Sequence, residues 1–418
     1  MTKINTETPA ELAADIRDER LIHREGIGGA VRGFVQRVRG GDLGSLPVVI
    51  GLILIWAIFQ ILNPNFLSSR NLVDLTMQSA ATGTIAIGVV LVLLIAQIDL
   101  SVGSISGLAA AIVAVGWMQL GWPTWTAILV ALAAAAIIGF LYGLLYTRFG
   151  VPTFVITLAG LLAVLGLQLK ILGAHGSINL PYDSWFVRLG TTLFLPPWAA
   201  YALAILAGVG MFLSDWLRSR RRVKAGLTGG SVSVMLTKSI VLLVLLVAAV
   251  WYLATTRGVG VMFVLFVLFV VIMNFFLTRT RWGRAVYAVG GNVEAARRAG
   301  IKVDRIVISV LVLGTLFAAI GGLFATAKLT AATLSSGAGD TNLMAIAAAV
   351  IGGTSLFGGR GSAYSALLGI FVLQSISNGL SLLNLDSSVR FMITGAVLLL
   401  AVIIDALSRR SRAAHGQA

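Results

Sequence analysis

The sequence predicts an all-α protein that folds as a polytopic bundle of transmembrane helices with about 12 hydrophobic segments. Of its 418 residues, 58% are hydrophobic and 11% are charged, and the mean hydropathy is +0.96. A single soluble core cannot bury so much apolar surface. Many apolar runs have about 20 residues, the helix length that crosses a hydrocarbon core of about 30 Å. These observations exclude a water-soluble globular protein.

Twelve segments are apolar enough to be proposed as membrane crossings. The segment 343–357 is short and rich in small residues, which fits a broken or re-entrant helix packed inside the protein as well as a complete crossing. Twelve crossings place both termini on the same side of the membrane. The segments cover residues 46–62, 77–97, 101–120, 124–146, 152–172, 193–214, 237–255, 259–278, 304–327, 343–357, 362–382 and 389–407.

The basic residues test this number of crossings independently of hydropathy. The formal net charge is +15, and twelve crossings place 25 of the 31 Lys and Arg residues on the side of the two termini. Cytoplasmic loops of membrane proteins carry such an excess. We therefore expect a multi-pass membrane protein with cytoplasmic termini. The lipid bilayer explains the basic excess, so no nucleic-acid partner is expected.

The charge pattern also divides the chain into regions. Residues 1–45 are expected to form a cytoplasmic tail, in which a capping box at 8–11 begins a charged helix. Residues 46–408 form the transmembrane domain, and residues 409–418 form a second cytoplasmic tail. Two cytoplasmic elements interrupt the transmembrane domain, a basic hairpin at 215–238 and a loop at 279–303. The basic run of the hairpin fits a stop signal that contacts anionic lipid headgroups.

The residue types that catalysis and metal binding require are scarce. The chain has no cysteine, and its three histidines are far apart, which disfavours thiolate chemistry and a metal cluster. The glycine-rich stretch 352–362 has Gly359 where a phosphate-binding loop requires Lys. Glycines between membrane helices more often permit tight turns and close packing. We expect a non-catalytic subunit without catalytic, metal-binding or cofactor-binding residues.

The loop at 279–303 contains the signature of a short helix outside the bilayer. Asn292 is a good N-cap, and Glu294 in the first turn complements the positive end of a helix. Gly300 suits the position that follows a helix C-terminus, and Ile301 supplies an apolar contact beyond it. The small side chains of Ala295, Ala296 and Ala299 are predicted to leave one side thin enough to enter a cleft.

These residues also resemble a known family. The run Glu294-Ala295-Ala296, followed after three residues by Gly300-Ile301, resembles the coupling-loop signature of permeases of ATP-binding-cassette importers. The stretches 283–292, 98–104 and 350–362 are similar to the monosaccharide permeases of the ribose, xylose and galactose type. Ribose-type permeases have one crossing between the positions of Leu193 and Val261, whereas this chain has two more and the basic hairpin. Longer permeases with such an insertion resemble the D-xylose branch.

The resemblance implies partners for the chain. Asn292, Glu294, Ala295, Ala296, Gly300 and Ile301 would dock on a separate ATPase subunit, which would hold ATP and Mg²⁺, so that this chain needs no cofactor. A periplasmic sugar-binding protein would deliver a monosaccharide, with D-xylose the preferred substrate. A second copy of the chain would complete the pathway as a homodimer. The function implied is that of the permease subunit of a sugar importer.

A neutral sugar needs hydrogen-bonding groups along its path. The candidate path residues are Gln78, Asp99, Ser101, Ser104, Gln374 and Asn378. Helical spacing puts Gln374 and Asn378 on one face. The other interpretation is that such groups form hydrogen bonds between helices, at about 0.6 to 2 kcal/mol each. Asp99 either contacts the ligand or caps the helix that begins near Ser101.

Two other functions are compatible with many crossings. An ion-coupled secondary sugar carrier would work without an ATPase, but the interiors of the predicted crossings contain almost no carboxylates, which such carriers use as ion or proton sites. A channel or scaffold subunit would show uptake that does not depend on ATP. The loop at 279–303 argues for the importer permease over both.

Overall fold

The computed structural model describes residues 46–173, 176–226 and 229–386, and beyond these residues 388, 389, 391–393, 395, 396, 399 and 403. The predicted tails 1–45 and 409–418, with the charged helix of the first tail, lie outside the described residues. The predicted crossing 389–407 lies mostly outside them as well.

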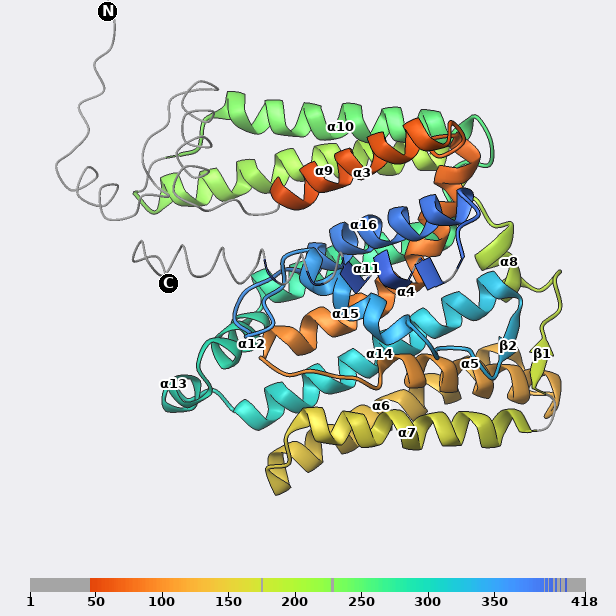
Figure 1. Ribbon diagram of the computed structural model, residues 1–418. Coiled ribbons are helices and arrows are strands. Elements are labelled where there is room, and N and C mark those ends of the chain that lie inside the picture. Colours follow the sequence, from red (N-terminus) through yellow and green to blue (C-terminus); the bar gives the residue numbers. More distant parts are fainter. Residues whose placement is uncertain are drawn as a thin grey trace, which may run out of the picture. The chain divides into compact units, whose positions relative to one another are not determined.

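The described elements are almost all helices (Figure 1). The two exceptions are three-residue strands, β1 (Ser177–Asn179) and β2 (Ala331–Thr333), which pair antiparallel with Ile178 opposite Ala332. The helices are α3 (Leu46–Leu62), α4 (Ser69–Leu94), α5 (Val102–Met118), α6 (Thr124–Phe149), α7 (Thr153–Leu172), α8 (Trp185–Thr191), α9 (Pro197–Lys224), α10 (Val232–Ala254), α11 (Val261–Arg279), α12 (Arg281–Gly291), α13 (Val293–Arg298), α14 (Val303–Leu329), α15 (Thr341–Ile351) and α16 (Ala363–Leu382).

The helices confirm the predicted polytopic membrane bundle. In the described part of the chain, eight helices are long and apolar enough to cross a membrane, namely α4, α6, α7, α9, α10, α11, α14 and α16. The shorter apolar helices α3, α5 and α15 accompany them, so twelve is an approximate number of segments. The helix α15 has 11 residues, which is a length of about 16 Å and roughly half of a hydrocarbon core.

The described residues divide into two compact units. One consists of residues within 195–258, and the other consists of residues within 46–194 and from 259 onward. In the first unit α9 and α10 pack against each other. The helix α9 continues to Lys224, beyond the predicted end of its crossing at 214, because Arg and Lys are good helix formers and their charges favour a helix C-terminus.

The second unit is built around α4 and α14 (Figure 1), which pack along each other. Their backbones approach closely at Gly88, where an added Cβ would lie 2.6 Å from the carbonyl oxygen of Gly314. On the other side of α14, Gly139 of α6 lies against Thr315 in the same way. Membrane helices have no hydrophobic driving force for association, and small residues let their backbones come close enough for van der Waals packing to hold them together.

Several elements differ from the sequence-based boundaries. The helix α4 begins at Ser69 rather than at 77, because Ser68 caps it by accepting a hydrogen bond from the Asn71 amide at 3.4 Å. The first turns of the helix contain polar residues, so their mean hydropathy is too low to indicate a membrane crossing. The helices α8 and α12 and the pair of strands were not predicted. Each is short, and α12 carries three positive or aromatic residues in its first four positions.

Candidate functional site

The predicted short helix near 292–301 is present as α13, preceded by the amphipathic helix α12. We call residues 281–300 the α12–α13 element. The Oδ1 atom of Asn292 accepts a hydrogen bond from the Ala295 amide at 2.9 Å, as an N-cap does. At the other end Gly300 has φ +81°, and the Ile301 amide donates to the Ala296 carbonyl at 3.1 Å. A residue in this left-handed conformation ends the helix, and glycine adopts the conformation without steric strain.

The faces of α13 differ from the prediction at one position. Ala295 and Ala299 are exposed and lie four residues apart, so they share one thin face. Ala296 is only 4% exposed and packs against the protein's own core. The expectation that Ala296 belongs to the docking face is therefore corrected, because the helix rotates it inward. Glu294 forms an exposed ion pair with Arg297 at 3.0 Å.

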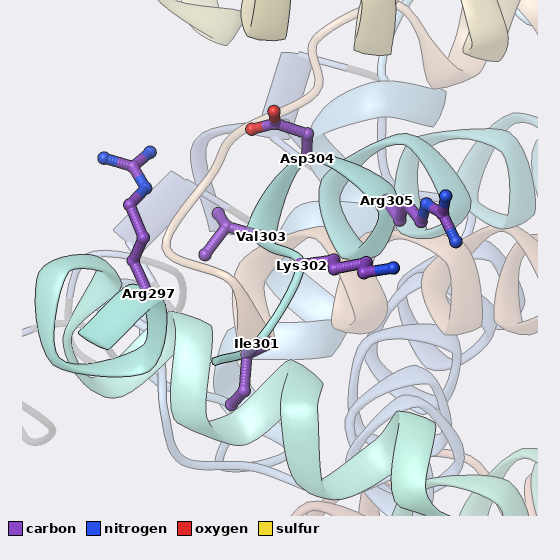
Figure 2. Close-up of a pocket in the computed structure, with 6 residues that line it drawn as sticks. All are labelled: Arg297, Ile301, Lys302, Val303, Asp304 and Arg305. Carbon is purple, nitrogen blue, oxygen red and sulfur yellow. The ribbon is translucent and has the colours of Figure 1, made fainter. Parts of the chain in front are cut away.

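A shallow cavity of about 360 Å³ lies between α13 and the start of α14. Figure 2 shows Arg297 on one side, Lys302 and Arg305 on the other, and the apolar Ile301 and Val303 between them. Asp304 is the one acidic side chain among its lining residues. The cavity therefore has an apolar floor and a positive rim.

The α12–α13 element is anchored to the core through α12. Trp282 donates its indole hydrogen to Ser309 Oγ of α14 at 2.8 Å, and the Tyr287 hydroxyl donates to the carbonyl of Gly361 at 2.8 Å. Burial raises the pKa of Tyr287, which extends to higher pH the range in which the hydroxyl is protonated and can donate. Near the end of α12, Gly290 lies directly against the Leu94 carbonyl at the end of α4. These contacts fix the element at several points.

The glycine-rich stretch 352–362, which we call the glycine loop, joins α15 to α16 and completes this junction. Its Gly359 amide donates to the Leu94 carbonyl at 2.9 Å, and the Ser355 amide donates to the Arg360 carbonyl at 2.9 Å. Gly358 and Gly359 have φ of +80° and +70°, which favour glycine. The tight turns and close packing expected of this stretch are present. The loop thus lies between the α12–α13 element, α4 and α15.

The candidate path residues of α4 and α16 form hydrogen bonds with one another. Gln374 Nε2 donates to Gln78 Oε1 at 2.6 Å, and the side-chain amides of Asn378 and Asn71 bond reciprocally at 2.8 and 3.0 Å. The structure therefore brings Gln78, Gln374 and Asn378 together, but as pairs between two helices. Asn71 was missed, because it precedes the predicted crossing 77–97. Its spacing of seven residues from Gln78 matches a helical face and was the available signal.

The remaining candidate path residues lie at the start of α5. Asp99 is 2% exposed, and its Oδ1 atom accepts from the amide and the hydroxyl of Ser101, both at 2.7 Å. Ser101, and not Asp99, is the N-cap residue of α5, and no side chain forms a cap hydrogen bond there. Asp99 therefore fixes the turn that precedes the helix, and its Oδ2 atom is buried without a hydrogen-bond partner among the described residues. The Ser104 hydroxyl donates to the Leu161 carbonyl of α7 at 3.0 Å. In the described residues no three His, Asp or Glu side chains gather where a metal ion could bind.

Bilayer-length helices packed through glycine contacts define a multi-pass integral membrane protein. Residues 71–402 match the family of branched-chain amino acid transport system permease components, and the chain belongs to this family.

The chain is similar to several characterised permeases over most of its length. It is 37% identical over 348 residues to the xylose transport system permease protein XylH of Escherichia coli K12, covering 82% of this chain and 87% of that protein. The corresponding protein of Haemophilus influenzae is 33% identical, covering 90% and 99%. The ribose import permease protein RbsC of Bacillus subtilis is 31% identical, covering 87% and 94%. No solved structure matches the chain.

Proposed function

We propose that this chain is the permease subunit of an ATP-binding-cassette importer that carries a monosaccharide, D-xylose, across the bacterial inner membrane. The similarity to xylose permeases over more than four fifths of both chains carries this proposal. The subunit performs no chemistry. It supplies the path, and its termini lie in the cytoplasm, in keeping with the distribution of basic residues.

The proposed ATPase partner docks on the α12–α13 element. Asn292 and Gly300 fix the ends of α13, Glu294 and Arg297 stiffen its exposed side, and Ala295 and Ala299 present a face without bulky side chains. The positive rim of the adjacent cavity fits an acidic partner surface. ATP and Mg²⁺ are bound by that partner. A periplasmic sugar-binding protein and a second copy of this chain complete the proposed assembly.

The anchoring of α12 suggests how the docking site acts on the membrane helices. Because Tyr287 and Gly290 contact the glycine loop and the end of α4, a displacement of the α12–α13 element cannot leave α4 and α15 unaffected. Packed elements respond to such displacements by moving as units. The pairs Gln78–Gln374 and Asn71–Asn378 keep α4 and α16 together, and we propose that they support the path beside Asp99, Ser101 and Ser104.

The proposal is tested in proteoliposomes that contain the chain and its purified ATPase partner. We expect ATP-dependent uptake of labelled D-xylose, and at least a tenfold loss of ATPase binding in Ala295→Trp and Ala299→Trp. Ala225→Trp is the matched control, since Ala225 is also an exposed alanine next to a helix end. Ala296→Trp is not a clean probe, because it overpacks a buried site. Uptake that survives ATP depletion and collapses with the proton gradient would favour the secondary carrier instead.

A further inference from the structure

The chain between β2 and α15 forms consecutive turns, with hydrogen bonds from the Ser336 amide to the Thr333 carbonyl and from the Ala338 amide to the Ser335 carbonyl. Residues 334–342, which we call the 334–342 segment, follow β2 and lead into the short helix α15. The Oδ1 atom of Asn342 accepts a hydrogen bond from the Gly103 amide in the first turn of α5. Non-helical backbone at membrane depth is tolerated only where it is buried in protein or lines a water-filled cavity. The segment therefore calls for a functional explanation.

One buried side chain holds this segment. Gln168 of α7 is fully buried, and its Nε2 atom donates to the carbonyl of Ser336 at 2.9 Å and to those of Thr333 and Leu334 at 3.4 Å. Its Oε1 atom is also buried and has no hydrogen-bond partner. A buried amide that lacks a partner for its oxygen is rare in native proteins. This oxygen is an acceptor directed at the interface of α5 and the segment.

The contact between the segment and α5 is made by backbone. A Cβ added at Gly107 would overlap the Ser336 carbonyl and would lie 2.7 Å from the Cδ atom of Gln168. Gly337 has φ +70° and lies against the Gly103 carbonyl in the same way. Leu334, the one large apolar side chain of the segment before α15, is 43% exposed. This contact with α5 is therefore made by backbone and by the polar side chains of Gln168 and Asn342.

The same segment is linked to the α12–α13 element through α15. Its end at Asn342 lies within the first turn of α15, and the other end of that helix enters the glycine loop. The glycine loop contacts Gly290 and accepts the hydrogen bond of Tyr287. A rigid helix of about 16 Å therefore connects the proposed docking site to the segment.

We propose that the 334–342 segment is a gate of the sugar path and that Gln168 holds it closed. The inference rests on the proposed function, and it adds the moving part to that function. Movement of the segment exposes the carbonyls of Thr333 and Ser336 and the amide of Gln168, which are donors and acceptors suited to the hydroxyls of a neutral sugar. The groups that hold the closed gate are thereby those that the passing ligand contacts.

The absence of cysteine from the sequence permits a direct test by reversible locking. The Ser106 hydroxyl lies beside Gly337 and the Ser336 carbonyl lies beside Gly107, so both serines belong to the same contact. The pair Ser106→Cys with Ser336→Cys is designed to join α5 to the segment there. The matched control is Asn179→Cys with Ala331→Cys, which joins paired residues of β1 and β2 without spanning the gate. Uptake is measured in proteoliposomes with the ATPase, after oxidation and again after reduction.

We expect oxidation to reduce uptake at least tenfold in the gate pair, reduction to restore it, and the control pair to keep its uptake throughout. Unchanged uptake with the disulfide formed would overturn the gate. Failure of the disulfide to form would also overturn it, because the two residues would then not be adjacent. If even the unmodified chain imports no sugar with ATP, the proposed function itself fails, which is a distinct result.

The role of Gln168 is tested separately by Gln168→Met, which keeps the size of the side chain and removes its amide. We expect sugar to leak from loaded proteoliposomes without ATP at least tenfold faster than with the unmodified chain. Gln119→Met, at the exposed end of α5, is the control for the same substitution. Equal leak rates in Gln168→Met and the unmodified chain, with both proteins folded by tryptophan fluorescence, would refute the holding role.

Discussion

The junction between α12 and α4 gives the sharpest prediction, the substitution Gly290→Ala. A Cβ at this position would lie 2.8 Å from the carbonyl carbon of Leu94 and 2.7 Å from the amide nitrogen of Gly359, and would overlap the Leu94 oxygen. Carbon atoms need about 3.5 Å, so relief of the carbon contact alone requires a shift of about 0.7 Å, and relief of the overlap with the Leu94 oxygen requires a larger one. The neighbouring Gly291 is the control, because an added Cβ there meets nothing within 4 Å.

The expected effect follows from two contributions. The added Cβ meets both the Gly359 amide and the Leu94 carbonyl and so breaks or lengthens the hydrogen bond between them, which is worth about 1 kcal/mol. Overpacking the close contact costs about 1–3 kcal/mol more. Gly290→Ala should therefore lower the free energy of unfolding by about 2–4 kcal/mol. Gly291→Ala should leave it unchanged or raise it by up to about 1 kcal/mol, because alanine loses less backbone entropy in a helix.

Unfolding by SDS in mixed micelles, followed by the fluorescence of the 9 tryptophans, measures both variants on the same scale. ATP-dependent uptake should also fall in Gly290→Ala, while Gly291→Ala keeps it. If the two alanine variants unfold at the same SDS concentration, the close approach of α12 to α4 does not exist, and the route from the docking site to the core described above is wrong.

Three further predictions concern polar contacts. A double-mutant cycle of Asn71→Leu and Asn378→Leu should give a coupling energy of about 1–2 kcal/mol for their two hydrogen bonds, and a value near zero would show that the pair does not form. Asn292→Ala should destabilise α13 by about 1 kcal/mol and increase its amide hydrogen exchange, whereas Asn292→Asp keeps the cap; equal exchange in both would contradict the cap. Asp99→Asn retains the acceptor for Ser101 and removes a buried charge, so its thermal stability should match or exceed that of the unmodified chain; a clear loss would indicate that the charge itself has a partner.

The sequence predicted those features that depend on local chemistry or on length. The first predicted crossing ends where α3 ends, at Leu62, and the cap at Asn292 and the left-handed Gly300 define α13 as expected. The shortness and the small residues of 343–357 fitted both a broken helix and a complete crossing, and the helix observed there, α15, ends at Ile351 after 11 residues. In each case the signal lies within a few residues of the feature it specifies.

Features that depend on tertiary packing could not be read in this way. Ala295 and Ala296 are identical and adjacent, and only the rotation of α13 on the core decides which of them faces outward. Gln168 gives no local signal, because its partners are more than 160 residues away. Hydropathy also hides the start of α4, where Asn71 is polar but belongs to the contact with α16.

The apolar helices that are buried in the protein and those that are exposed on its surface should tolerate different substitutions. In α4, 89% of the most apolar window is buried inside the protein, whereas in α10 the figure is 11%. A saturation library selected for growth on the transported sugar should therefore accept almost any lipophilic residue along most of α10. Along α4 it should discriminate between Ala, Val and Leu, because there the neighbouring backbone, and not the lipid, sets the permitted volume.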